Sequence, residues 1–485
     1  MPPINANVSN VPNFPLGARK LSMHAGTPGQ VLFQFIMVLA GALSAALPAF
    51  GDAIDAANPD DYVAKLKILK PGNHLRLAPG EYKEGLPIQY LQGTAQAPII
   101  ISGPDSGPRP VFIARPRHNT ISIINSSYIT LRNLDLDGRN LPVDGVKCEG
   151  HAGWAHHIIL DGLRVSGHGN NQQTVGISTK CPAWGWVIRN SVIDGAGTGL
   201  YLGNSDGRAP FIGGLIEHNL IVDTQGYNLQ IKHQQTRSVL PDMPVEPRAT
   251  IIRHNVFSKA QGGSSGEMAR PNVLVGHWPL SGPGSQDRYL VHGNFFYQNP
   301  HESLFQGEGN IALYNNLFVN DFGDAIRIQP HNDTPREVSV FYNTVIATAS
   351  GIRLARREGD APYRQVIAGN AIFSRIPSTG YRDEGNLVGT YEAAGKYLAK
   401  PFAPLGEMEL SPLQVKPNAA SMETTGLRVY PGWNVDFDGR RGSDRFGAYA
   451  SHGPPRWLPR LEIKPLSSAA MNADRKAGWR TGFSK

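Results

Sequence analysis

Three stretches of the sequence decide its fold: GLIEHNLIV at residues 214–222, TIIRHNVFS at 250–258 and YLVHGNFFY at 289–297. Each places apolar residues before and after a polar pivot, which in all three is an asparagine. Six more segments with the same pattern lie at residues 128–136, 157–165, 185–193, 312–320, 338–346 and 365–373. The nine pivots are Asn133, Gly162, Asn190, Asn219, Asn255, Asn294, Asn316, Asn343 and Asn370. A segment that recurs in this way indicates a repeat architecture.

A second series of short apolar segments alternates with the first. Its members are DGVKC (144–148), VGIST (175–179), TGLYL (198–202), YNLQI (227–231), PNVLV (271–275), ESLFQ (302–306), DAIRI (324–328) and SGIRL (350–354). Two or more short strands in most spans of 22–29 residues, with no helical pattern between them, are typical of a parallel β-helix solenoid. We expect inward side chains to fill the bore and turn asparagines to stack into ladders that pair buried backbone groups.

This pattern resembles right-handed parallel β-helix proteins of the pectate-lyase-like kind over roughly residues 64–376. The fold expected is therefore all-β, with a cap near residues 55–69, because the end coil of a solenoid exposes apolar bore residues. We assign residues 54–400 to the β-helix with its N-terminal cap. Residues 401–485 are expected to form a docking segment, with a strand at 434–449, and a poorly ordered tail.

The N-terminus carries an almost wholly apolar run at residues 31–50, preceded by Arg19 and Lys20. This arrangement is typical of a signal peptide, and the alternative is an N-terminal membrane anchor, since about 20 apolar residues can span a bilayer. We assign residues 1–53 to this segment. The body of the protein is therefore expected to be exported, as a secreted, periplasmic or cell-surface protein.

The charge of the chain indicates which class of partner it can bind, and its two cysteines raise the question of a disulfide. The formal net charge is +7, which suits an acidic partner. The chain has neither a lysine/arginine run nor a nucleic-acid-binding motif, so we expect acidic polysaccharide and no nucleic acid, bound by a monomer. Cys148 ends one strand of the second series, and Cys181 lies just past the end of the next coil's strand. Coils stack about 4.8 Å apart and a disulfide needs Cα atoms within roughly 7 Å, so the pair can form a bridge; the alternative is two buried thiols.

Two consecutive steps between pivots are long, 36 and 39 residues, and they mark a candidate cleft. The extra residues lie at 234–248, 261–271 and 279–287. Insertions in solenoids often gather on the binding face, whereas the alternative is neutral drift in solvent loops. The expected substrate-binding residues of this cleft and its adjoining coils are Lys180, Tyr201, His233, Arg237, Arg248, Trp278, Arg288 and Arg327.

Strand parity places Lys232 on the floor of this cleft. If Leu229 and Ile231 fill the bore, Gln230 and Lys232 face outward. Glycines at 203 and 276 then leave space on both sides of the lysine. The same face is expected to continue through Phe305, Arg327, Gln329 and Arg353. A lysine whose pKa is lowered by neighbouring cations can remove the C5 proton of a uronate, which is the first step of β-elimination.

The run LQIKHQ…TIIRHNVF…VLVGHW…YLVHGNFF resembles the catalytic coils of the alginate lyase and chondroitinase B type of polysaccharide lyase. The resemblance implies that Lys232 is the catalytic lysine and His277 the catalytic histidine. The family's arginine position is held by Gly276. Where its calcium-binding glutamates stand, this chain has Gln225 and Tyr227. No cofactor is therefore certain, and Ca²⁺ would lack its expected acidic ligands.

Two other functions fit the same fold. One is a non-catalytic glycan-binding or cell-surface β-helix, favoured by the missing arginine and calcium acids. The other is a glycoside hydrolase or epimerase. Inverting hydrolysis needs two carboxylates about 6.5–9.5 Å apart. A GHG motif at residues 167–169 occurs without an acid-bearing strand beside it, so we expect it to be a turn. No metal site is predicted from the histidines.

Overall fold

The computed structural model describes residues 51–360, 363–380, 383–413, 425–442, 445–450 and 454–465. Chain contacts separate residues 1–46 from residues 47–485, and everything below concerns the second unit. The apolar run assigned to export lies outside the described residues, as does most of the expected tail. No helix within the described ranges is long and apolar enough to cross a membrane.

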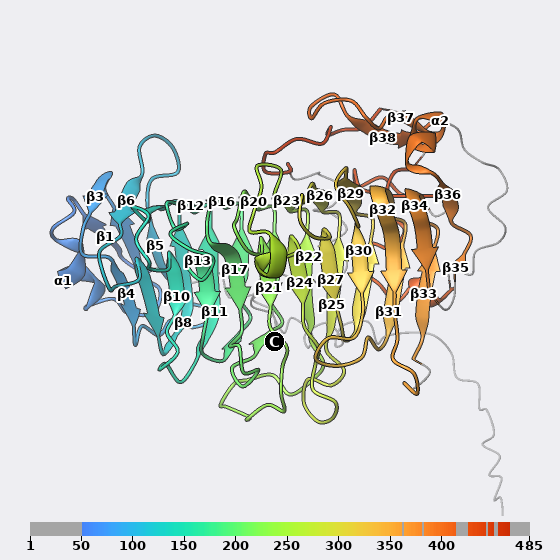
Figure 1. Cartoon of the computed structure of the whole chain (residues 1–485). Coiled ribbons are helices and arrows are strands. Elements are labelled where there is room, and N and C mark those ends of the chain that lie inside the picture. Colours follow the sequence, from blue (N-terminus) through green and yellow to red (C-terminus); the bar gives the residue numbers. More distant parts are fainter. Residues whose placement is uncertain are drawn as a thin grey trace, which may run out of the picture. The chain divides into compact units, whose positions relative to one another are not determined.

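The described chain is a right-handed parallel β-helix, as the sequence predicts (Figure 1). Its strands form three parallel ladders that run along the helix axis. Ladder I contains β1 (Ala53–Ala56), β2 (His74–Leu77), β5 (Ile99–Ser102), β8 (Ser126–Arg132), β11 (Ala155–Asp161), β15 (Val187–Arg189), β19 (Leu215–Glu217), β22 (Ala249–Arg253), β25 (Arg288–His292), β28 (Ile311–Tyr314), β31 (Val338–Phe341), β33 (Gln365–Ala368) and β35 (Asp383–Glu384), with β14 (Ala183–Trp184) and β18 (Phe211–Ile212) beside it.

Ladders II and III join through two long strands, β32 (Thr344–Leu354) and β34 (Ala371–Thr379). Ladder II also contains β3 (Gly80–Tyr82), β6 (Pro110–Ile113), β9 (Asp135–Asp137), β12 (Arg164–Ser166), β16 (Val192–Asp194), β20 (Leu220–Val222), β23 (Val256–Ser258), β26 (Phe295–Tyr297), β29 (Leu317–Asn320) and β36 (Leu387–Gly389). Ladder III also contains β4 (Leu86–Gln89), β7 (Ile121–Ile124), β10 (Val146–Cys148), β13 (Val175–Thr179), β17 (Thr198–Leu202), β21 (Leu229–Ile231), β24 (Val273–Val275), β27 (Phe305–Gly307) and β30 (Ile326–Ile328).

The remaining elements lie at the two ends of the described chain, apart from one turn in its middle. Near the N-terminal end is α1 (Tyr62–Leu66), and in the middle a single turn, η1 (Gly266–Met268), lies in a loop. After the last coil come η2 (Tyr391–Ala393), α2 (Ala394–Tyr397), the antiparallel pair β37 (Leu398–Lys400) and β38 (Glu409–Pro412), and η3 (Thr425–Leu427). Tyr62 and Leu66 of α1 are buried in the main core, so the expected cap is present.

The bore of the helix is filled by stacked apolar side chains. On ladder III, Leu229 pairs with Val273, and Val273 pairs with Phe305, in register; all three are fully buried. Phe305 was expected to face outward, and this prediction is wrong. Its segment carries two adjacent apolar residues, Leu304 and Phe305, so parity alone does not say which one enters the bore. Gln306 takes the outward position.

A ladder of buried asparagines runs along one corner of the helix. The side-chain amide and the backbone N–H of each asparagine both donate to the side-chain carbonyl oxygen of the next asparagine. The members are Asn219, Asn255, Asn294, Asn316, Asn343, Asn370 and Asn386. The seventh residue, Asn386, follows the last repeat found in the sequence.

In the first coils the predicted pivots are displaced by one position. Asn133 and Asn190 have φ of 57° and 52°, and they occupy the left-handed position just before the ladder position. Asparagine tolerates this conformation better than most residues, so the corner selects it there for a different reason. In the Asn190 coil the ladder position is Ser191, whose hydroxyl accepts the backbone N–H of Leu163.

The C-terminal segment packs on the outer faces of ladders I and II. Phe437, Tyr449 and Trp457 share a core cluster with ladder II residues such as Phe295 and Leu317. The expected strand at 434–449 is not formed as such in its described residues: the segment consists of turns with an isolated bridge between Val435 and Arg441.

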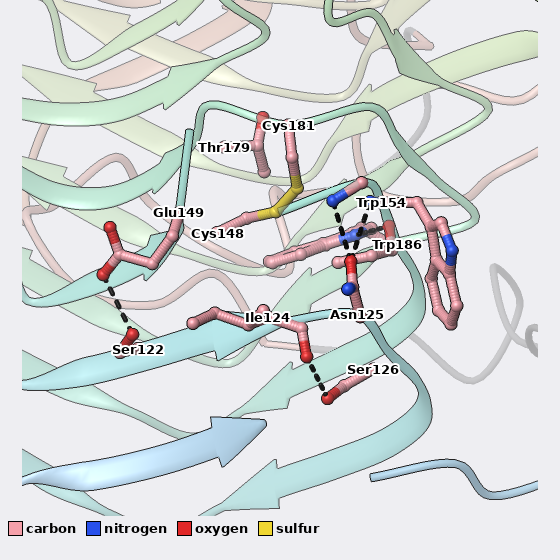
Figure 2. The surroundings of a disulfide bond; sticks show 12 residues. Ser122, Ile124, Asn125, Ser126, Cys148, Glu149, Trp154, Thr179, Cys181 and Trp186 are labelled. Carbon is pink, nitrogen blue, oxygen red and sulfur yellow. Dashed lines mark hydrogen bonds between the residues drawn. A yellow bond between two sulfur atoms is a disulfide. The ribbon is translucent and has the colours of Figure 1, made fainter. Parts of the chain in front are cut away.

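Cys148 and Cys181 form a disulfide between adjacent coils, with Cα atoms 6.0 Å apart (Figure 2). Both residues belong to the main core. The indole of Trp186 lies near the bridge in Figure 2, and its Nε1 donates to the carbonyl of Ala155. The pair thus ties together the first two coils of the row of outward residues described below.

We predict that Asn294→Ala lowers the free energy of unfolding by about 1–3 kcal/mol, because it leaves buried backbone groups of two coils without partners. Urea unfolding followed by circular dichroism measures the loss. The control is Asn170→Ala on an exposed turn, which should change stability by less than about 0.5 kcal/mol. Equal effects of the two substitutions would contradict a stabilising role for the ladder.

We also predict that replacing both Cys148 and Cys181 by alanine lowers unfolding stability by about 3.5 kcal/mol, since the bridge closes a loop with a sequence separation of 33 residues. The urea midpoint of the double variant should not change when a reductant is added. A double variant that unfolds at the same urea concentration as the unaltered, oxidised protein would show that the bridge contributes nothing to stability.

Candidate functional site

The outward residues of ladder III form one continuous row across the coils. Residues at equivalent positions pair in register from strand to strand. The row contains Lys147, Ser178, Tyr201, Gln230, Leu274, Gln306, Arg327 and Arg353. Strand parity therefore placed Tyr201, Gln230, Arg327 and Arg353 correctly.

A second row begins where these strands end, and it brings two lysines to one tyrosine. Lys180 and Lys232 lie on either side of Gly203, at the same position of their coils. The Nζ atom of Lys180 lies 3.2 Å from the centre of the Tyr201 ring, and that of Lys232 lies 5.9 Å from it. A Cβ on Gly203 would lie 3.3 Å from the Cβ of Lys232, so the glycine provides the space between the lysines.

Burial weakens the positive charge of both lysines. The pKa of Lys180 is lowered to about 8, chiefly by loss of solvent; the negative charge of Asp144 opposes this shift, and the positive charges of Lys147 and Lys232 add to it. Burial also lowers the pKa of Lys232, against the opposing charge of Glu308. A lysine with a pKa near 8 is a free amine in a sizeable fraction of molecules at neutral to mildly basic pH.

Two histidines stand beside Lys232. The rings of His233 and His277 stack with centroids 5.3 Å apart and planes inclined by 23°. Burial lowers the pKa of His233, and the charges of His277 and Lys232 add to this effect. The Nδ1 atom of His277 lies 3.0 Å from the carbonyl oxygen of Trp278. The structure therefore assembles Lys180, Tyr201, Lys232 and the two histidines as one cluster.

Trp278 and Arg237 do not belong to this cluster. Trp278 is fully buried, and its indole stacks on Tyr289 with ring centroids 4.4 Å apart. Arg237 is buried in an ion pair with the equally buried Asp287. Both side chains fold inward from the insertions and fasten the two loops to each other and to the core. We therefore remove both residues from the substrate-binding set.

Three other expected residues lie elsewhere or are already paired. Arg248 and Arg288 are exposed at the start of ladder I strands, and the charge of Arg248 acts on His157. Arg327 is on ladder III as predicted. Its guanidinium contacts Glu302 at 3.1 Å and Asp324 at 2.7 Å.

A cavity of about 330 Å³ opens on ladder III beyond the lysines. It is lined by Tyr227, Ala269, Arg270, Pro271, Leu274, Glu302, Gln306, Gly307, Glu308, Gln329 and His331. Sequence reasoning missed it because one wall comes from the 261–271 insertion, whose path is not set by the repeat. The available signal was Glu308, which follows β27 in the same coil position as Gly276 and Lys232.

The expected calcium position offers poor ligands. The amide of Gln225 donates to the carbonyl of Gly169, and Tyr227 contributes a phenol to the cavity wall. In the parts of the chain that the structure describes, no three His, Cys, Asp or Glu side chains gather as a metal site. The residues present do not fit a calcium ion, and no chemical step is derived through one.

We predict that Lys180 titrates near pH 8, well below the ordinary lysine value of 10.5. Its side-chain resonance can be followed by NMR and assigned by its loss in Lys180→Arg. In Lys232→Met the pKa of Lys180 should rise, because one neighbouring positive charge is gone. A Lys180 that titrates at the ordinary value would contradict the buried environment described here.

No protein-family model and no curated protein matches the chain. Solved structures do resemble it. PL6-family alginate lyase AlyGC is 11% identical with a TM-score of 0.35, over 68% of this chain and 51% of that chain, so the match spans about half of its length. A mannuronic-acid-specific family 6 lyase from human gut microbiota is 14% identical with a TM-score of 0.41, over 70% of this chain and 82% of that chain. The GH87 α-1,3-glucanase of Streptomyces thermodiastaticus is 11% identical with a TM-score of 0.40, over 72% of this chain and 69% of that chain. Sequence identities and TM-scores this low show a similarity of fold and nothing about function.

Proposed function

We propose that this protein is an exported polysaccharide lyase that cleaves uronate-containing chains by β-elimination on ladder III. The observation that supports it is the pair of lysines on either side of Tyr201, one of them with a pKa lowered to about 8. A free amine and an ammonium held close together are the two groups that proton removal from a uronate requires.

In this mechanism Lys232 pairs with the uronate carboxylate, which makes the C5 proton more acidic. Free Lys180 removes that proton, the C4–C5 double bond forms, and the C4–O bond breaks. Burial raises the pKa of Tyr201, so its hydroxyl stays protonated and gives a proton to the leaving oxygen. Water then returns the proton from Lys180 to Tyr201. His233 and His277 flank the carboxylate beside Lys232.

The roles of the two lysines differ from the sequence-based expectation, in which Lys232 was the base. The reason for the change is the environment of each amine. Each lysine faces one negative charge, Asp144 for Lys180 and Glu308 for Lys232, but Lys180 is more deeply buried and is also repelled by Lys147 and Lys232. The amine with the lower pKa is the better base near neutral pH.

Non-catalytic glycan binding is the second candidate. Gly276 in place of an arginine and the absence of calcium acids near Gln225 favour it. Hydrolysis has less support. The two carboxylates of the cavity are both engaged, since Glu302 binds Arg327 and Glu308 accepts three backbone N–H groups of residues 331–333. Neither carboxyl group is set up as a free acid or base.

We predict that kcat/KM for elimination rises with pH through about 8 and then levels off, because the free amine of Lys180 is the reactive form. Lys180→Arg keeps the charge but loses the base, so kcat should fall by about 10²-fold or more. Lys232→Arg should keep activity within about tenfold, whereas Lys232→Met should raise KM. The ultraviolet absorbance of the unsaturated uronate measures each rate.

The control is Lys83→Arg on an exposed strand end, which should not alter the rate. A Lys180→Arg chain as active as the unaltered protein would show that another group is the base. If no polymer gains unsaturated ends while oligosaccharides still bind, the protein is the non-catalytic binder.

A further inference from the structure

The cavity beyond the lysines lies on the path that a polysaccharide would follow along ladder III. Gln230 pairs with Leu274 and Leu274 with Gln306, so the cavity floor begins one coil after β21. Successive coils are about 4.8 Å apart. A sugar unit in an extended chain advances by a similar length, so a chain with one uronate at the lysines places a neighbouring unit in the cavity.

The walls of the cavity suit the neutral parts of a sugar. Tyr227 and Leu274 present an aromatic ring and an aliphatic side chain, against which the C–H face of a pyranose can stack. Gln306 and Gln329 add side-chain amides that can both donate to and accept from hydroxyl groups. One donor hydrogen of Gln306 is already directed at the hydroxyl of Ser303.

The charges of the cavity disfavour an anion. Its lining carboxylates and guanidinium are those of Glu302, Glu308 and Arg270, which sum to one net negative charge. Arg270 is engaged through Nη1 with the carbonyl oxygens of Glu267 and Ala269.

The carboxylate of Glu308 is fixed beside the cavity and cannot turn away into solvent. It is 2% exposed, and the backbone N–H groups of residues 331–333 hold its carboxylate in place. Arg327, which lies next to the cavity on the same row, is occupied by Glu302 and Asp324. A second carboxylate or a sulfate in the cavity would therefore face the fixed negative charge of Glu308, and the cationic lining residue Arg270 already donates to two backbone carbonyl oxygens.

The charge along the row thus reverses within two coils. Lys180 and Lys232 are followed by Gly276 and then by Glu308 and Gln329. Building on the proposed uronate site at the lysines, we propose that the cavity binds an uncharged sugar unit. The substrate is then a heteropolysaccharide in which uronates adjoin sugars that carry neither carboxylate nor sulfate, and not a homopolymer of uronates.

Binding tests this inference apart from catalysis. Hexasaccharides of unsulfated chondroitin, of 4-sulfated chondroitin and of polymannuronate are titrated calorimetrically into the Lys180→Arg chain and into the unaltered chain. The unsulfated alternating hexasaccharide should bind at least about tenfold more tightly than the other two. Equal or tighter binding of polymannuronate, or of the sulfated oligosaccharide, would overturn the inference.

A charge-adding variant tests the cavity itself. Gln306→Arg places a cation in the cavity, so it should tighten polymannuronate binding by about tenfold and reduce the selectivity accordingly. The matched control is Gln96→Arg, an exposed residue near the N-terminal cap, which should leave the selectivity unchanged. A Gln306→Arg chain with unaltered selectivity would overturn the inference as well.

The two proposals fail in different ways. Selective binding of the unsulfated alternating oligosaccharide without unsaturated product on any polymer would refute the lyase and keep the cavity's assignment. Elimination of polymannuronate as fast as of unsulfated chondroitin would keep the lyase and refute the assignment.

Discussion

The structure depends on the pairing of buried backbone groups at the corner between ladders I and II. From Asn219 to Asn386 this pairing passes through side-chain amides, each of which serves its own coil and the next. Because every amide needs its neighbour at the same position, the ladder holds successive coils in register. The outward rows of ladder III follow from that register. Tyr201, Gln230 and Gln306 lie in one line only because the coils do not slip against each other.

Glycines on the second row convert this regular surface into a site. A side chain at Gly203 would crowd Lys232, and one at Gly276 would collide with the backbone of Lys232 and His233. With both positions empty, the long side chains of Lys180 and Lys232 lean toward Tyr201 and lose solvent. Loss of solvent is the first cause of the lowered pKa of each lysine. The chemistry proposed for the groove is therefore a consequence of two missing side chains.

The sequence predicts the repeating part of the molecule well and the insertions poorly. Period and parity are properties of the repeat, so they placed Gln230, Lys232 and the glycines beside it. Arg237 lies in an insertion and Trp278 directly before another, where no period tells an inward residue from an outward one. Polar and aromatic residues in a long loop suggest contact with a ligand, yet both fold inward to fasten the loop. The prediction for Phe305 was wrong for a related reason, because two adjacent apolar residues left it undecided which of them faces inward.

The C-terminal segment explains why ladder III is the face that remains for a ligand. The later coils carry apolar residues outward on the other two ladders, such as Tyr314 on ladder I and Phe295 on ladder II. Tyr430 and Phe437 of the C-terminal segment pack on those two faces, and buried Lys464 donates to the carbonyl oxygens of Gly293 and Phe437.

The outward row of ladder III has a different composition in the later coils, in which polar and charged residues such as Gln306, Arg327 and Arg353 predominate. An apolar outer face is stable only when another part of the chain covers it, whereas a polar row is stable in contact with water. The same chemistry that lets this row stay wet lets it exchange water for the hydroxyl and carboxylate groups of a sugar chain. Under the proposed function, the outward side chains therefore assign cover by the C-terminal segment and access for a polymer to different faces.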